Sequence, residues 1–244
     1  MKKFEKYFMD NYIIFCVYAL IGWIYEVSWY LIVKHTFVNR GVLFGPFLPI
    51  YGFGILILLF FLKKFMKQKH TLSNPLWSTL SISTIVSFIF ITIIEYSTPK
   101  IYRVDVFFQN YGLYLILVNI ISLLIFHLIM KKNSKLKNID STIILIFLLI
   151  WIITTLIEYI AHYFIDVYSH KLLLDYTYDF LNINKRVNWD ASRNFAIGGT
   201  LLLYTIQPLL NKFLDKTKWN KKLIMVLILG IPMLIDFLCN VVLK

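Results

Sequence analysis

The chain has 244 residues, of which 59% are hydrophobic and only 16% are charged. A soluble domain needs a larger polar fraction to keep its surface wetted, so this composition excludes an ordinary soluble enzyme and indicates an integral membrane protein in contact with a lipid bilayer. The formal net charge is +12. The sequence has no basic stripe interleaved with stacking aromatics, so the charge is assigned to anionic lipid and no nucleic-acid partner is expected.

Seven apolar runs follow one another along the chain, at residues 11–33, 49–65, 76–96, 111–130, 141–165, 194–210 and 223–243. A spanning helix needs about 20 predominantly apolar residues. The sequence therefore predicts an all-α, polytopic membrane bundle of about seven transmembrane helices. Six is the alternative, because the second and sixth runs are short. The connections are short, so residues 1–244 are expected to form a single transmembrane domain.

The positive charges predict the orientation of the chain. Lysines gather at the N-terminus and in the second, fourth and sixth connections between the runs. Short positively charged loops stay in the cytoplasm, so the N-terminus is predicted to lie inside. Lysine is much more frequent than arginine, which is typical of an AT-rich bacterial genome. We therefore expect a multi-pass protein of a bacterial plasma membrane.

Four carboxylates fall within the apolar runs, namely Glu26, Glu95, Glu158 and Asp236. A carboxylate in the hydrocarbon region is costly unless it is paired, hydrogen-bonded or neutralised. Each of the four lies toward the C-terminal part of its run, so the predicted topology puts them all in the outer half of the bilayer. This pattern predicts a polar site there. The alternative is that each acid pairs locally for structural reasons, which we favour for Glu95 at the end of its run.

Glu158, His162 and Asp166 are spaced i, i+4 and i+8, so they share one stripe at the end of the fifth run. Carboxylate and imidazole at this spacing can relay protons or bind a metal. The stripe lacks an HExxH pair, and no partner ligand is evident, so no metal is predicted. His162 is retained as a possible relay, with a packing histidine as the simpler alternative.

Two irregular segments separate apolar runs on the predicted outer side. Residues 34–48 contain VNRGVLFGP, which is rich in glycine and proline and can fold back as a re-entrant or turn segment. We expect it to bring Asn39 and Arg40 toward Glu26, as a structural clasp or as the floor of a site for an anion. Residues 166–193 are predicted to form an extracellular loop or lid that presents Trp189 and Asp190. A helix lying passively at the head groups is the alternative.

Two blocks of the sequence carry a family resemblance. GWIYEV at Gly22–Val27 and the following NRGVLFGPFLPIYGFG closely resemble a bacterial family of putative ABC transporter permeases, also called ABC transporter type IV. The family shows similar G-W-x-x-E, N-R-G-x-L-x-G-P and P-I-Y-G-x-G motifs. Further along, Glu158 and Tyr159 precede NWDASRNFAIGGT, where the family typically has W-D-Y-S and F-N-L-N-G-R-I. The matching positions in this block are Trp189, Asp190, Ser192, Phe195 and Gly199.

The second block also departs from the family, at Ala191, Ala196 and Thr200. Thr200 stands where the family has an arginine. If that arginine holds an anion in relatives, this chain lacks it or uses Arg193 or Arg186 instead.

The resemblance implies a transporter or permease subunit that works without a cofactor. The chain contains no G-x-x-x-x-G-K-[ST] loop, so ATP-driven transport requires a separate ATP-binding subunit. The cytoplasmic connections are short and show no obvious helix for such a subunit to move. A homo-oligomer is a further possibility.

Two other functions stay open. In an intramembrane enzyme, paired carboxylates would act as acid and base on a lipid or cell-envelope precursor, with His162 as relay and Arg40 holding a phosphate or carboxylate. In a scaffold or regulatory protein, the same side chains serve packing alone. The residues proposed for a substrate-binding or structural polar cluster are Glu26, Asn39, Arg40, Glu158, Trp189, Asp190 and Asp236.

Overall fold

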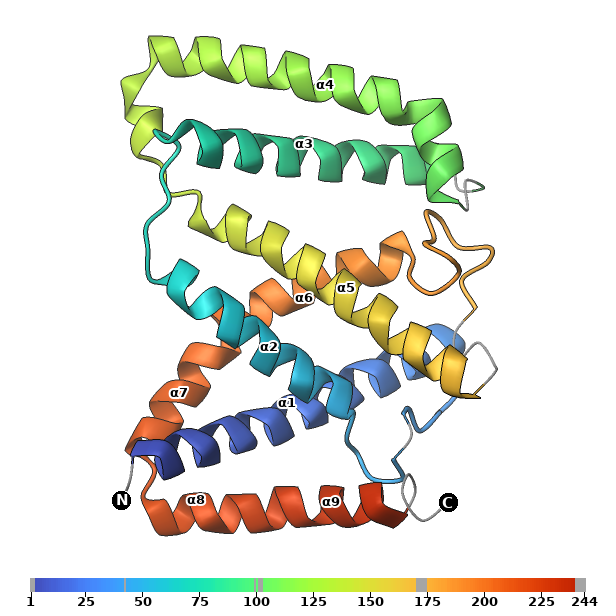
Figure 1. Ribbon diagram of the computed structural model, residues 1–244, viewed down its shortest axis with the longest axis vertical. Coiled ribbons are helices and arrows are strands. Elements are labelled where there is room, and N and C mark those ends of the chain that lie inside the picture. The colour runs from blue at the N-terminus through green and yellow to red at the C-terminus, as the bar shows by residue number, and fades with distance from the viewer. Residues whose placement is uncertain (1–2, 42, 99, 101–102, 170–174, 240–244) are drawn as a thin grey trace. The chain divides into compact units, whose positions relative to one another are not determined.

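The computed structural model describes residues 3–41, 43–98, 100, 103–169 and 175–239, and all the regular elements in these residues are helices (Figure 1). This confirms the predicted all-α class. The elements are α1 (Lys3–Lys34), α2 (Pro49–Met66), α3 (Pro75–Ser97), α4 (Val104–Lys132), the 3-10 helix η1 (Ser134–Asn138), α5 (Thr142–Ser169), α6 (Trp189–Tyr204), α7 (Ile206–Lys216), α8 (Trp219–Met225), the π-helix η2 (Val226–Gly230) and α9 (Ile231–Phe237).

Five helices are long and apolar enough to cross a membrane, at Glu5–Lys34, Pro49–Met66, Pro75–Ser97, Val104–Lys132 and Thr142–Val167. They correspond to the first five predicted runs. Helix α4 illustrates why they need lipid, since it exposes a long series of leucines and isoleucines, including Leu113, Leu124 and Leu128. An apolar surface of this extent is unfavourable in water and is at home in a bilayer. The chain is therefore a multi-pass membrane protein.

The sixth predicted run, residues 194–210, is not one helix, so that part of the prediction is wrong. Helix α6 ends at Tyr204 and α7 begins at Ile206. Pro208 explains the break, because it has no N–H for the carbonyl of Tyr204 and its ring would clash with that carbonyl in a continuous helix. Helix α7 is amphipathic, with Gln207 and Leu214 buried and Lys212 and Lys216 exposed.

The seventh predicted run forms a continuous helical stretch from α8 through η2 to α9, although residues 240–243 of the run lie outside the described part. A proline also accounts for the widened π turn. Pro232 offers no N–H to the carbonyl of Ile228, which lies within η2, and a π segment accommodates such a gap. Gly230 in this segment packs so closely on Tyr12 that an added Cβ would lie 2.4 Å from its ring.

The chain packs as two units, Met1–Phe61 with Leu202–Lys244, and Leu62–Leu201. In the first unit, α1 lies beside the helical stretch formed by α8, η2 and α9 (Figure 1). Helix α1 and this stretch run in the same direction (Figure 1).

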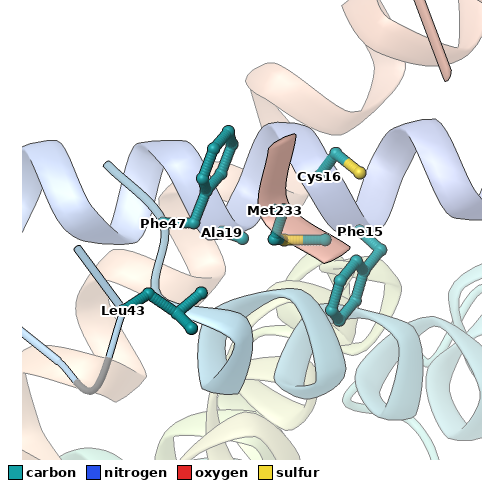
Figure 2. Packing of buried hydrophobic residues seen from close by; sticks show 6 residues of the cluster. All are labelled: Phe15, Cys16, Ala19, Leu43, Phe47 and Met233. Carbon is teal, nitrogen blue, oxygen red and sulfur yellow. The ribbon is translucent and has the colours of Figure 1, made fainter. Parts of the chain in front are cut away.

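The core of the first unit joins α1, the segment before α2, and α9. It consists of the buried side chains of Phe15, Cys16, Ala19, Leu43, Phe47 and Met233 (Figure 2). Helix α2 approaches α1 closely at glycine positions. A Cβ added at Gly52 would lie 2.5 Å from the Phe15 ring and 2.7 Å from the Phe15 carbonyl oxygen, whereas one added at Gly54 would meet nothing within 4 Å.

Alanine substitutions at these two glycines of α2 should therefore have opposite effects. Gly52→Ala is expected to lower the free energy of unfolding by about 1 to 3 kcal/mol, because the helix must move away from the Phe15 backbone. Gly54→Ala is expected to be neutral or to raise it by up to about 1 kcal/mol through helix propensity. Denaturant unfolding of the purified protein in one detergent measures both. Equal effects would contradict the close packing.

The second unit pairs α3 with α4 and α5. At the end of this unit where α3 begins, the two connections on either side of the α3–α4 pair bond to each other. The Ser141 N–H donates to the His70 carbonyl (2.8 Å), and the Leu72 N–H to the Ile139 carbonyl (3.1 Å). The His70 N–H donates to the Thr142 hydroxyl (2.9 Å). Hydrogen bonds between the two short connections thus hold both of them in place. The α4–α5 connection also contains the 3-10 helix η1, which the sequence did not predict.

Asp140 stabilises the hydrogen-bonded contact between the α2–α3 and α4–α5 connections, and its contribution to the free energy of unfolding should depend on pH. Hydrogen bonds from the Thr142 hydroxyl and N–H hold the pKa of Asp140 below its usual value. A lowered folded pKa gives a stabilisation that is present above the unfolded pKa of about 3.9 and is lost as the pH falls through the folded value. Because Asp140 is exposed, we expect about 1 kcal/mol or less.

The measurement is the thermal midpoint between pH 6 and pH 3 for the wild type and Asp140→Asn. The midpoint difference should be largest at pH 6 and should shrink at the acid end. A constant difference across this range would show that the carboxylate charge contributes nothing.

Candidate functional site

The irregular segment that follows α1 carries an arginine clasp. Arg40 Nε donates to Glu26 Oε2 at 2.9 Å, and the Tyr51 hydroxyl donates to Glu26 Oε1 at 2.9 Å. The Arg40 guanidinium also lies 4.4 Å above the Tyr30 ring. Glu26 and Tyr30 are one turn apart on α1, which places the carboxylate and the ring on one face. The predicted approach of Arg40 to Glu26 is confirmed, and Tyr51 of α2 completes the clasp.

Further hydrogen bonds hold the backbone of the same segment. Asn39 accepts from Trp23 Nε1 (2.7 Å) and donates to the Phe44 carbonyl (2.9 Å). Asp236 of α9 accepts the N–H groups of Phe44 (3.1 Å) and Gly45 (2.5 Å). A carboxylate that accepts two backbone N–H groups satisfies donors that a turn would otherwise leave open.

The segment also folds back along α1 instead of leading straight from one helix into the next. The Leu48 N–H donates to the carbonyl of Ala19 (2.9 Å), which lies 15 residues before the end of α1, or about 22 Å along the helix axis. Leu43, Phe47 and Leu48 are buried. Helix α2 therefore begins beside the middle of α1, and the segment between the two helices is anchored by Leu43, Phe47 and Leu48 while residues 35–39, Gly41, Phe44 and Pro46 are exposed. Val42 of this segment lies outside the described residues.

A second cluster lies at the C-terminal end of α5, in the other unit. Arg186 Nε donates to Asp166 Oδ2 (2.7 Å), and the same hydrogen bond raises the pKa of Arg186 above its usual value. His162 Nδ1 lies 2.6 Å from the Arg186 carbonyl oxygen, so it donates the proton. This fixes the tautomer when His162 is neutral and leaves Nε2 as the basic nitrogen. Glu158 and His162 are both buried.

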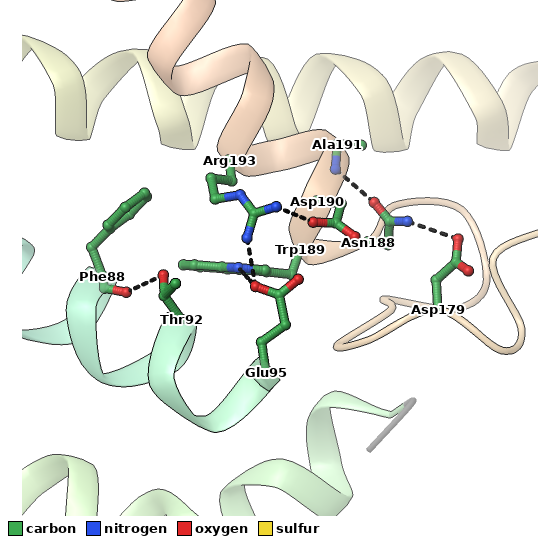
Figure 3. Close-up of polar contacts among 9 residues, drawn as sticks. All are labelled: Phe88, Thr92, Glu95, Asp179, Asn188, Trp189, Asp190, Ala191 and Arg193. Carbon is green, nitrogen blue, oxygen red and sulfur yellow. Dashed lines mark hydrogen bonds and ion pairs between the residues drawn. The ribbon is translucent and has the colours of Figure 1, made fainter. Parts of the chain in front are cut away.

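A third cluster joins the start of α6 to the end of α3 (Figure 3). Arg193 donates to Glu95 Oε2 (2.5 Å) through one terminal nitrogen and to Asp190 through the other. Trp189 Nε1 donates to the same Glu95 oxygen (3.0 Å). Asn188 caps α6 by accepting the Ala191 N–H (2.7 Å). The cap and the ion pairs together fix the first turn of α6 against α3.

One family model covers both units of the chain. Residues 13–109 and 104–241 match the family described as putative ABC-transporter type IV. The chain belongs to this family. No curated protein and no solved structure matches this type IV chain. The resemblance seen in the sequence is thereby confirmed, and it extends over the helices between the two motif blocks.

The polar residues form one group in the first unit and two groups in the second unit. Glu26, Asn39, Arg40 and Asp236 meet around the segment after α1. His162 of α5 lies beside Arg186, with Glu158 buried one turn before it, and Trp189 and Asp190 meet the Glu95–Arg193 pair at the start of α6. Each of the three groups thus contains an ion pair of its own. Within the described residues, no three His, Cys, Asp or Glu side chains come together as metal ligands.

The predicted loop 166–193 of the type IV chain is shorter than expected. Helix α5 continues to Ser169 and α6 already begins at Trp189, so the irregular part among the described residues is 175–188, while 170–174 lie outside them. Arg186 and Asn188 hold this part against α5 and α6. Such ordering indicates a fixed connection within the unit.

Sequence reasoning about the type IV chain missed one buried ion pair. Lys222, assigned to a cytoplasmic loop, lies in α8 with its side chain only 3% exposed and donates to Asp10 of α1. The sequence contains a partial indication, because Asp10 is an acid directly before the first apolar run. Its partner lies 212 residues further along the chain, which no local pattern reveals.

Proposed function

We propose that the chain is the membrane-embedded, permease-type subunit of a transport system and that a separate ATP-binding subunit drives it. The observation that carries the proposal is the family match, which covers residues 13–241 in two overlapping parts. Five apolar helices of spanning length supply the membrane domain. ATP hydrolysis needs a phosphate-binding loop, and this sequence contains none.

The proposed orientation puts the N-terminus in the cytoplasm of a bacterial cell. Lys63 and Lys64 at the end of α2, and Lys131 and Lys132 at the end of α4, then flank the membrane on the cytoplasmic side. In this orientation, the α2–α3 and α4–α5 connections, which are hydrogen-bonded to each other through His70 and Ser141, present an ordered surface to the cytoplasm. An ATP-binding subunit could bind to this surface and transmit its conformational change to the helices.

The three polar clusters would then lie at the opposite, outer side, because α1, α3, α5 and α9 all carry their acids near their C-terminal ends. We assign each of them to the outer half of the bilayer, where polar side chains can meet a transported solute. The acids are held by arginines, tryptophan and backbone N–H groups. This arrangement supports solute contact and positioning more than acid–base catalysis, which requires a carboxylate that can exchange protons with a substrate.

The test is to purify the protein from its native membranes in a mild detergent and to identify stoichiometric partners by mass spectrometry. We expect an ATP-binding protein to co-purify and the complex to hydrolyse ATP. The control is a second multi-pass protein of the same membrane, purified with the same tag. If the chain is repeatedly obtained alone, stable and without any ATPase, the proposal is wrong.

A further inference from the structure

Arg40 uses only part of its guanidinium group. Its Nε donates to Glu26, while neither terminal nitrogen donates to any of the residues that the structure describes. Two of the other three arginines, Arg103 and Arg193, bond through terminal nitrogens, whereas Arg186 donates through Nε to Asp166, as Arg40 does to Glu26. Arg103 binds Asp105 with Nε and one terminal nitrogen (2.9 and 2.6 Å), and Arg193 uses both terminal nitrogens on two carboxylates. Arg40 therefore keeps the paired N–H edge that suits a phosphate or carboxylate.

The surroundings of Arg40 hold this edge in a defined position. Its side chain is 23% exposed, so the group reaches solvent without moving freely. The Tyr30 ring supports the guanidinium plane from one side, and Nε is tied to Glu26. Lys34 is exposed and lies one turn beyond Tyr30 on the same face of α1. Two positive groups thus flank the Tyr30 ring at the end of a spanning helix.

Glu26 does not cancel this positive potential. Both of its oxygens already accept hydrogen bonds, one from Arg40 Nε and one from the Tyr51 hydroxyl. The carboxylate neutralises one charge of the group, and Lys34 leaves a net positive charge.

We propose that Arg40, with Lys34 beside it, binds a phosphate-bearing group at the membrane surface where α1 ends. The ligand class is a phosphate monoester or diester, carried either by an anionic lipid or by a soluble phosphate ester. A phosphate accepts hydrogen bonds from both terminal nitrogens of one arginine. At the level of the lipid head groups, such a group is abundant. This inference goes beyond transport, because it requires only binding.

The test uses the purified full-length protein in detergent, with binding followed by native mass spectrometry. The probes are phosphatidylglycerol, diacylglycerol with the same acyl chains, and glycerol 1-phosphate. We expect the wild type to bind phosphatidylglycerol about tenfold more tightly than diacylglycerol, which has no phosphate, as one charge-assisted hydrogen bond would give. Competition by glycerol 1-phosphate would assign the site to soluble esters, and the absence of competition would assign it to lipid.

Variants of Arg40 and Arg103 test whether the clasp causes the preference for the phosphate-bearing lipid. Arg40→Lys should lose most of the preference, because an ammonium cannot present the paired edge. Arg103→Gln is the matched control, since its arginine is at least as exposed but already bound to Asp105, and it should keep the preference.

Arg40→Gln alone leaves Glu26 unpaired, so the double variant Glu26→Gln with Arg40→Gln is included to keep a folded protein. The double variant is expected to bind both lipids equally. A preference that persists in the double variant, or that is lacking in the wild type, overturns the proposal. Neither result depends on an ATP-binding partner, so this failure is distinguishable from a failure of the transport proposal.

Discussion

Asp10→Asn is expected to lower the free energy of unfolding by about 3 to 5 kcal/mol, because it leaves the ammonium of Lys222 buried without a counter-charge. The Lys222 side chain is 3% exposed, and its nitrogen donates to Asp10. A buried charge that loses its partner retains the full cost of desolvation. Equilibrium unfolding of the purified protein in detergent measures the loss.

The chain contains a matched control for this pair. Lys6 and Asp215 also join α1 to the C-terminal part of the first unit, but their side chains are 45% and 70% exposed. Asp215→Asn should therefore cost at most about 1 kcal/mol. The double variant Asp10→Leu with Lys222→Met should recover most of the stability, because it removes both charges and keeps apolar volume. Equal effects of Asp10→Asn and Asp215→Asn would refute the role of burial.

Trp189→Ala is the second substitution with a large expected effect, about 3 to 5 kcal/mol. The ring is buried, and it lies 5.2 Å from Trp151 and 5.4 Å from Phe88, measured between ring centroids. Its indole N–H donates to Glu95. Removal of the side chain opens a cavity among aromatic rings and takes a donor from a partly buried carboxylate.

Two further variants separate these contributions. Trp189→Phe keeps most of the volume but loses the N–H donor, so a loss of about 1.5 to 3 kcal/mol is expected. Asp190→Asn, whose side chain is 49% exposed, should cost about 1 kcal/mol or less. Unfolding followed by circular dichroism gives all three values. If Trp189→Phe equals Trp189→Ala, the hydrogen bond and not the packing dominates.

Much of the fold follows from the length of the apolar runs. The first five runs became spanning helices because a long apolar stretch has one stable conformation in lipid, a helix that satisfies its own backbone. The clasp of Glu26 and Arg40 was also accessible, since the two residues are 14 positions apart and a buried carboxylate demands a partner.

Other features depend on information that composition does not contain. A hydropathy scale does not exclude Pro208 from a spanning helix, so the sequence predicted one continuous helix there. In the structure, the proline ring prevents continuation of α6, and the amphipathic helix α7 follows. The shared depth of the four acids predicted a polar site in the outer half of the bilayer and did not identify their partners. The structure shows local partners for Glu26, Glu95 and Asp236. Depth restricts where an acid lies, but the partner depends on which helices become neighbours.

The segment after α1 has a particular consequence for the order in which the protein matures. Contacts of the clasp join residues 14 and 25 positions apart, so they can form as soon as α1 and α2 have been synthesised. Asp236, in contrast, reaches the Phe44 and Gly45 amides across 192 and 191 positions. Until α9 emerges from the ribosome, these two amides lack the acceptor that finally holds them. The last helix thus finishes a turn that began near the start of translation, and a nascent chain that stops before α9 retains an open, unsatisfied turn between its first two helices.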